Sequence, residues 1–149
     1  MFDRLLKLLE NPEPKPPTHD ELQHAVAVLL VEAARMDDRF DDAERGRIDH
    51  LLADKFHLSA EERQRLLAAA ETTAKQSSQL HPFTRLAFTR MDPAERCRLI
   101  EMLWEVAYAD GVLDAEEDLL LRRVAGLIYV SDHERIAARQ RVLQRLGKT

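Results

Sequence analysis

Five short patterns of the same kind mark the starts of helices along this chain. In each, a Ser, Thr or Asp is followed three residues later by Glu. Each of the two side chains can then accept the backbone N–H of the other residue in the first helical turn. The pairs are Thr18–Glu21, Asp41–Glu44, Ser59–Glu62, Asp114–Glu117 and Ser131–Glu134. Together with Asp92, which precedes Pro93 at a first helical position, they predict an all-α fold of about seven helices.

The residues after these starts supply a candidate core. Apolar residues recur at spacings of three and four, which places them on one face of each helix. The chain has only 4 glycines among 149 residues, which argues against a turn-rich β-sandwich or barrel. Trp104 and Tyr108, four residues apart, form either a core aromatic pair or one wall of a small groove. The predicted core residues are Leu22, Val26, Leu29, Ile48, Leu51, Phe56, Leu99, Met102, Leu103, Val106, Leu121 and Val124.

The second half of the chain repeats the pattern of the first. Asp37 recurs 73 residues later as Asp110, and the same offset relates Glu44 to Glu117. Chance similarity between amphipathic helices would match apolar positions, but it would not match carboxylates. We therefore predict two three-helix repeats that are related by a pseudo-twofold axis and share one core. The predicted repeats span residues 18–70 and 92–146 of a domain at 18–149.

The N-terminal segment differs from the rest of the chain. Residues 1–10 place Phe2, Leu5, Leu6 and Leu9 on one helical face, and residues 11–17 hold four of the 6 prolines. Proline restricts the backbone and removes hydrogen-bond donors, so residues 11–17 are predicted to be an extended linker. A helix as short as 1–10 is unstable alone. It is therefore expected to pack on its own domain, or on a partner or membrane surface.

Two acidic loops are the candidate functional sites. They read ARMDDRFDDAE at 34–44 and AYADGVLDAEE at 107–117, and each arranges its carboxylates as D-x-x-x-D-x-x-E. The last two carboxylates of each loop suit a helix N-terminus. The first, Asp37 or Asp110, lies at a helix C-terminus, where the macrodipole disfavours negative charge. The candidate residues are Asp37, Asp41, Glu44, Asp110, Asp114 and Glu117.

Two interpretations of these loops remain open. The carboxylates either cap helices and brace the loops, or they form an oxygen-ligand site for Ca²⁺ or Mg²⁺. An EF-hand is excluded, because the third loop position, counted from Asp37 or Asp110, is Arg39 or Val112 rather than an oxygen ligand.

The acidic loops and the stretch EMLWEVAYADGVLDAEEDLLLRRVAGLIYVS at 101–131 resemble the TerB-like family of tellurite-resistance proteins. The resemblance covers about residues 21–143. The opening MFDRLL and the HPFTR at 81–85 are similar to small stand-alone, largely uncharacterised members. The resemblance implies an all-helical domain linked to tellurite and other chemical stress, to membrane-associated complexes and, for one related domain, to co-chaperones.

The resemblance also implies that divalent cations bind the six loop carboxylates. The first loop departs from the family pattern at Asp38, where the second has Gly111, and at Ala43, where the second has Glu116. The second loop is therefore the closer match.

Composition narrows the classes of function. A net charge of −5, from 22 basic and 27 acidic residues, argues against general binding to nucleic acid or membrane surfaces. With one Cys, no apolar run of about 18 residues and no signal-peptide pattern, a cytoplasmic protein that is not integral to a membrane is expected. Cys97 lies between Arg96 and Arg98. These arginines could lower its pKa, or the thiol could be inert and partly buried.

Enzymatic motifs are absent from the sequence. It has no Gly-rich phosphate loop and no H-E-x-x-H pair, and the one E-x-x-H motif, Glu21 to His24, lacks the second copy that a di-iron site needs. We therefore expect a protein that is not an enzyme. An enzyme of this size would need a buried set of carboxylates with perturbed pKa values around a pocket.

The last helix is basic. Its cationic residues either face solvent near the helix C-terminus or form a docking surface for an acidic partner or a second copy. They are Arg135, Arg139, Arg141, Arg145 and Lys148.

The sequence thus predicts a non-enzymatic, TerB-like interaction and stress-response module with divalent cations at its acidic loops. The alternative is a metal-independent structural adaptor that docks through its N-terminal or C-terminal helix. In either case the expected partner is a protein, including a component of a membrane-associated complex, rather than nucleic acid; a homodimer is compatible with both.

Overall fold

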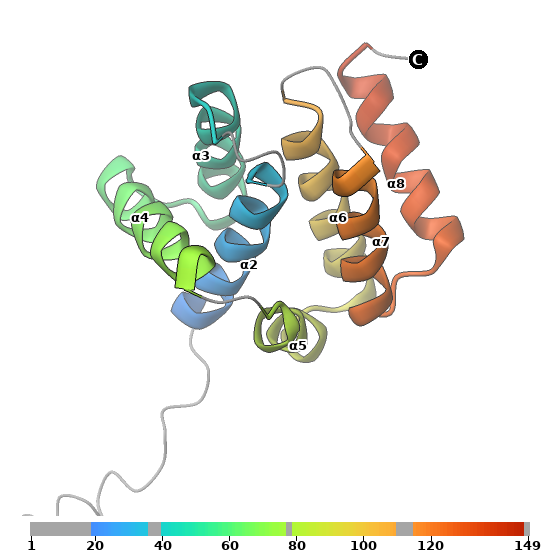
Figure 1. Cartoon of the computed structure of the whole chain (residues 1–149), viewed down its shortest axis with the longest axis horizontal. Helices are drawn as coiled ribbons and strands as arrows, with labels where there is room; N and C mark the ends of the chain where they lie inside the picture. Colours follow the sequence, from blue (N-terminus) through green and yellow to red (C-terminus); the bar gives the residue numbers. More distant parts are fainter. Residues whose placement is uncertain (1–18, 36–39, 77–78, 110–114, 148–149) are drawn as a thin grey trace, which may run out of the picture.

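The chain folds as an all-α structure (Figure 1). A computed structural model describes residues 19–35, 40–76, 79–109 and 115–147. Within these ranges the chain forms seven α-helices and no strand, which confirms the predicted class. The predicted N-terminal helix at 1–10 and linker at 11–17 lie outside them. The helices are α2 (His19–Ala34), α3 (Asp42–Phe56), α4 (Ala60–Gln76), α5 (His81–Arg90), α6 (Pro93–Ala107), α7 (Ala115–Leu127) and α8 (Asp132–Arg145).

The predicted helix starts are confirmed wherever the structure describes them. At α3, the Asp41 carboxylate accepts the Glu44 N–H at 2.8 Å, and the Glu44 carboxylate accepts the Asp41 N–H at 3.4 Å. The same reciprocal bonds join Ser59 to Glu62 at the start of α4. Such bonds satisfy N–H groups that have no partner within the helix. At the start of α6, Asp92 and Glu95 form the same reciprocal pair, and at the start of α8 the Ser131 hydroxyl accepts the Glu134 N–H.

Helices α2 and α6 form the centre of the molecule. Residues 25–31 of α2 are at most 1% exposed, and every residue of α6 from 99 to 107 is buried. The other helices surround this pair (Figure 1): α2 contacts α3, α4, α5 and α7 as well as α6, and α6 contacts α3, α7 and α8. A helix that is apolar around most of its circumference is stable only in such a position.

The core prediction is confirmed for ten of its twelve residues. Leu22 and Phe56 are instead partly buried and pack against the core. The prediction missed Leu30, which lies on the apolar stripe, and Val28 and Val31, which lie outside it; all three are buried. The continuous apolar run at 25–31 was the feature that could have revealed burial on all sides.

None of the described helices is both long enough and apolar enough to span a membrane.

Candidate functional site

The first acidic loop joins α2 to α3. Asp41 is exposed, whereas Glu44, the third residue of α3, is only 4% exposed. Beside them, the Arg45 guanidinium lies 4.5 Å from the centre of the Phe40 ring, a distance typical of a cation–π contact. Asp37, the first of the predicted ligands, lies outside the described residues. Asp41 and Glu44 are therefore placed together by the capping box.

The second acidic loop joins α6 to α7. Glu117, the third residue of α7, is 4% exposed. Glu44 and Glu117 thus occupy the same position in their helices and are buried to the same extent. Asp110 and Asp114 lie outside the described residues.

The predicted cation sites are not tested by this geometry. Across residues 19–35, 40–76, 79–109 and 115–147, no three His, Cys, Asp or Glu side chains are grouped so that they could hold a metal ion. Three of the six predicted ligands, Asp37, Asp110 and Asp114, lie outside these ranges. Both sites therefore stay predictions.

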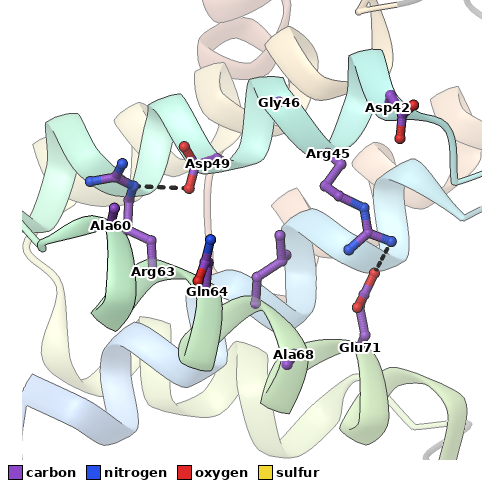
Figure 2. Close-up of a pocket in the computed structure, with 10 residues that line it drawn as sticks. Asp42, Arg45, Gly46, Asp49, Ala60, Arg63, Gln64, Ala68 and Glu71 are labelled. Carbon is purple, nitrogen blue, oxygen red and sulfur yellow. Dashed lines mark hydrogen bonds and ion pairs between the residues drawn. The ribbon is translucent and has the colours of Figure 1, made fainter.

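A groove of about 410 Å³ runs between α3 and α4 (Figure 2). Two ion pairs cross it: Arg45 to Glu71 at 2.6 Å and Arg63 to Asp49 at 2.9 Å. An added Cβ at Gly46 would meet no atom within 4 Å, so the groove is open at this point. The charged side chains that line the groove are therefore mainly paired with each other.

A cluster of charged residues between α6 and α8 was not predicted as a site. Glu101 and Glu105 of α6 are 8% and 9% exposed. The Arg145 guanidinium bonds both, at 2.7 Å to Glu101 and 2.5 Å to Glu105. Burial by itself would lower the pKa of Arg145, but its hydrogen bonds to the two carboxylates outweigh this and raise the pKa. Arg98 and Arg141 complete the cluster, at 3.4 Å from Glu105 and Glu101 respectively.

The interpretation of the last helix as a solvated basic face is confirmed for Arg141 and Arg145, which are exposed, but not for Arg135, which is buried; all of them also contact groups of the chain. Arg139 donates to the Tyr108 hydroxyl at 2.9 Å, and Arg135 pairs with Asp132 at 3.5 Å. With Arg141 and Arg145 bound to Glu101, all four described basic residues of the predicted set contact groups of this chain; Lys148 lies outside the described residues. The sequence feature that could have indicated a partner for the basic residues of α8 is the pair Glu101 and Glu105, four positions apart on α6.

Trp104 and Tyr108 form the core pair rather than a groove wall. Their rings are stacked, with centroids 5.8 Å apart, and they are 0% and 8% exposed. Arg139 lies over the Trp104 ring at 5.6 Å, so the aromatic pair also joins α6 to α8.

The fold and these sites can now be compared with known proteins. A family model described as tellurite resistance protein TerB matches residues 23–140. The chain belongs to the TerB family. No curated protein and no solved structure matches it.

Membership of the TerB family confirms the resemblance expected from the sequence. The matched span begins in α2 and ends in α8. It includes both acidic loops and most of the α6–α8 cluster, whereas the N-terminal segment precedes it. The matched part of this TerB-family chain therefore lies within the helical domain predicted at 18–149.

The only cysteine of the chain is an inert thiol rather than an activated one. Cys97 is partly buried, and its thiol donates to the Glu134 carboxylate at 2.9 Å. Burial and this bond to a carboxylate raise the pKa of Cys97 to about 11. Of the two alternatives for Cys97, the structure supports the inert, partly buried thiol, because Arg96 lies over the Phe88 ring and Arg98 pairs with Glu105.

We expect Cys97 to react slowly with iodoacetamide. At pH 8 about one thiol in a thousand would be ionised, and the rate should rise about tenfold per pH unit from pH 8 to 10. The Glu134→Gln variant should react faster, because it removes the negative charge beside the thiol. Mass spectrometry of the alkylated native protein measures both rates. A native rate that levels off near pH 8 would show an activated thiol instead.

Proposed function

We propose that this TerB-family chain is a non-enzymatic interaction module of a stress response, tuned by Ca²⁺ or Mg²⁺ at its two acidic loops. The observation that carries the proposal is the equivalent burial of Glu44 and Glu117, each the third residue of the helix that follows a loop. Both carboxylates have interactions within the chain, and that of Glu44 accepts the Asp41 N–H, so each buried group is held at the same point beside its loop. Two such carboxylates at matching positions, each next to further loop carboxylates, support a shared role for the loops.

The proposed mechanism is electrostatic. A cation bound by Asp110, Asp114 and Glu117 would reduce the repulsion between carboxylates at the joint of α6 and α7. It would thereby fix the angle between these two helices. Because α7 packs on α5 and α8 as well as on α6, a change in its angle would alter the surface that a partner meets.

The proposal of two equivalent sites depends on a duplicated architecture, for which the packing gives support. In each half, the first helix contacts the second and third, and the second contacts the third. The second helix of each half also contacts the first helix of the other half, as α3 does α6 and α7 does α2. These matching contacts favour a pseudo-twofold relation between α2–α4 and α6–α8.

The absence of catalytic activity is also part of the proposal. In the groove between α3 and α4, Arg45 and Arg63 are already paired with carboxylates of the chain. Arginines that are paired in this way favour a structural role for the groove rather than a catalytic one.

Calorimetric titration with Ca²⁺, Mg²⁺ and Mn²⁺ tests the cation proposal. We expect saturable heat from two sites in the native protein, and from the first loop alone in the Asp110→Ala variant, which lacks a ligand of the second loop. The matched control is the double variant Asp92→Asn with Glu95→Gln. It alters a capping box of the same geometry at the start of α6, outside both acidic loops, and should bind cations as the native protein does. Equal and negligible heats from all three proteins would contradict the proposal.

The second candidate function is a metal-independent adaptor that binds a protein partner through a terminal helix. The basic residues of α8 that the structure describes contact the chain's own α6 and α8 groups, which favours the N-terminal helix for this role. An adaptor of this kind would bind its partner equally well in EDTA and in Ca²⁺, whereas a cation-tuned module would not.

A further inference from the structure

An apolar face at the surface is formed by α5, α7 and the turn after α7. Three of the four large hydrophobic side chains that are exposed among the described residues lie here: Phe88, Leu119 and Tyr129, at 40%, 63% and 76%. The rings of Phe88 and Tyr129 are in contact, with centroids 4.8 Å apart. A cavity of about 290 Å³ lies between them and Gly126, and another of about 210 Å³ lies along α7 at Leu119. We call this surface the α5–α7 face.

The backbone at Tyr129 supports a role for this face. Tyr129 has a φ of 59°, a left-handed conformation that glycine adopts without strain and bulky residues rarely adopt. The turn is closed by the Val130 N–H, which donates to the Ala125 carbonyl at 2.8 Å. A strained backbone therefore holds a mostly exposed aromatic ring against Phe88. An exposed apolar patch of this kind is typical of a surface that another segment covers.

The charge of the α5–α7 face indicates what covers it. α5 carries Arg85 and Arg90 and no acidic residue, and residues 119–131 carry two arginines and no acidic residue. The acidic residues of α7 lie in its first turn, where Glu116 lines the cavity at Leu119 and Asp118 pairs with Arg122, so the positive charge is concentrated toward α5 and the last turns of α7. In the described part of the chain, Arg85 and Arg123 make no ion pair. This local excess of positive charge stands out in a chain of net charge −5. The face thus suits an apolar segment with an acidic edge.

We propose that the N-terminal segment of the same chain, residues 2–10, covers the α5–α7 face. As a helix, it would present the apolar side chains identified above. At about 100° per residue, Asp3 and Glu10 would lie beside this apolar face, whereas Arg4 and Lys7 would lie opposite it. The acidic edge would then meet Arg85 and Arg123, and the basic edge would face solvent.

The tether is long enough for this contact. Residues 11–18 span about 25 Å when extended in the manner of proline-rich chains. They lead into α2 at His19, and α2 contacts α5 within its second turn, where the His24 and Phe83 rings are 6.2 Å apart. α5 lies between the first turns of α2 and the last turns of α7 (Figure 1). Crossing one helix, about 10 Å in diameter, is therefore within reach.

The other open surfaces suit this segment less well. The groove between α3 and α4 is crossed by ion pairs, and apart from Leu67 its apolar lining consists of the small residues Gly46, Ala60 and Ala68. Ile136, the fourth large exposed hydrophobic residue of the described part, lies on α8 and lines neither the groove nor the two cavities of the α5–α7 face. Neither offers a large apolar surface with a positive edge.

The experiment compares amide spectra and hydrogen exchange of three full-length proteins by NMR in EDTA. In the Leu5→Asp, Leu6→Asp variant, the amides of Phe88, Gly126 and Tyr129 should shift. Their exchange should become faster by at least about threefold, because the covering segment is lost. The matched control, Arg4→Gln with Lys7→Gln, changes the opposite edge of the segment and should leave these amides unchanged.

A second variant tests the contact from the other side. Gly126→Glu adds a side chain in open space, since a Cβ there meets no atom within 4 Å. The added acid should displace the segment and speed exchange at residues 2–10. The proposal is overturned if neither variant affects the opposite surface, if the shifts fall on the groove between α3 and α4, or if they vanish on dilution. Because cations are absent throughout, none of these outcomes bears on the cation proposal.

Discussion

Replacing Trp104 with Ala should lower the free energy of unfolding by about 3–5 kcal/mol. The side chain is 0% exposed, stacks on Tyr108 and lies beneath Arg139 of α8. Its removal would leave a cavity at the centre of the domain and would loosen α8 from α6. Urea unfolding followed by far-ultraviolet circular dichroism measures the change without relying on tryptophan fluorescence.

Two variants show whether the Trp104 effect comes from lost packing. Ile136→Ala, at a half-exposed position on α8, should change stability by less than about 1 kcal/mol. Trp104→Phe should lose only part of the stability, because the indole N–H has no hydrogen-bond partner among the described residues and no bond would be broken. A Trp104→Ala loss as small as that of Ile136→Ala would refute the central position of this ring.

Replacing Arg145 with Ala should lower the free energy of unfolding by about 2–3 kcal/mol. The change would leave the carboxylates of Glu101 and Glu105, each less than one tenth exposed, with only Arg98 and Arg141 to balance them. Removing one partner of a fully buried ion pair costs about 3–5 kcal/mol. The loss is reduced here because the Arg145 side chain is itself 45% exposed. Urea unfolding at constant ionic strength measures it.

The control for Arg145 is Lys75→Ala. Lys75 is exposed in the last turn of α4 and forms no ion pair with any described residue, so its loss should change stability by less than about 0.5 kcal/mol. In a Glu101→Gln, Glu105→Gln background, Arg145→Ala should also cost little, because the charges it balances are gone. Equal effects of Arg145→Ala in both backgrounds would show that the cluster contributes no coupling.

The sequence predicts the parts of this fold that depend on neighbouring residues. The start of α3 follows from Asp41 and Glu44, which are three residues apart and bond each other directly. The contact between α6 and α8 is different, because Arg145 meets Glu101 across 44 positions. No local pattern specifies such a pairing. The basic residues of α8 therefore suggested a solvent-exposed face until tertiary packing showed their partners.

In the candidate sites, too, contacts between neighbouring residues were predicted and contacts between helices were not. Capping predicted that Asp41 and Glu44 lie together, but the burial of Glu44 depends on how α3 packs on α2 and α6. The pKa of Cys97 depends on Glu134, 37 positions away, and its neighbours in sequence, Arg96 and Arg98, suggested the opposite shift. Electrostatic environments at this level are set by contacts between helices rather than by adjacent residues.

The position of α2 has a consequence for how the molecule comes apart. This helix packs against α3 and α4 from the first half of the chain, and also against α5, α6 and α7, which follow later in the sequence. A fragment that ended after α4 would expose much of the apolar surface of α2 to water. Such a fragment would tend to associate with a second copy that buries this surface. The helices before and after α5 are therefore not expected to unfold one after the other. Thermal unfolding of the whole domain should be a single two-state transition.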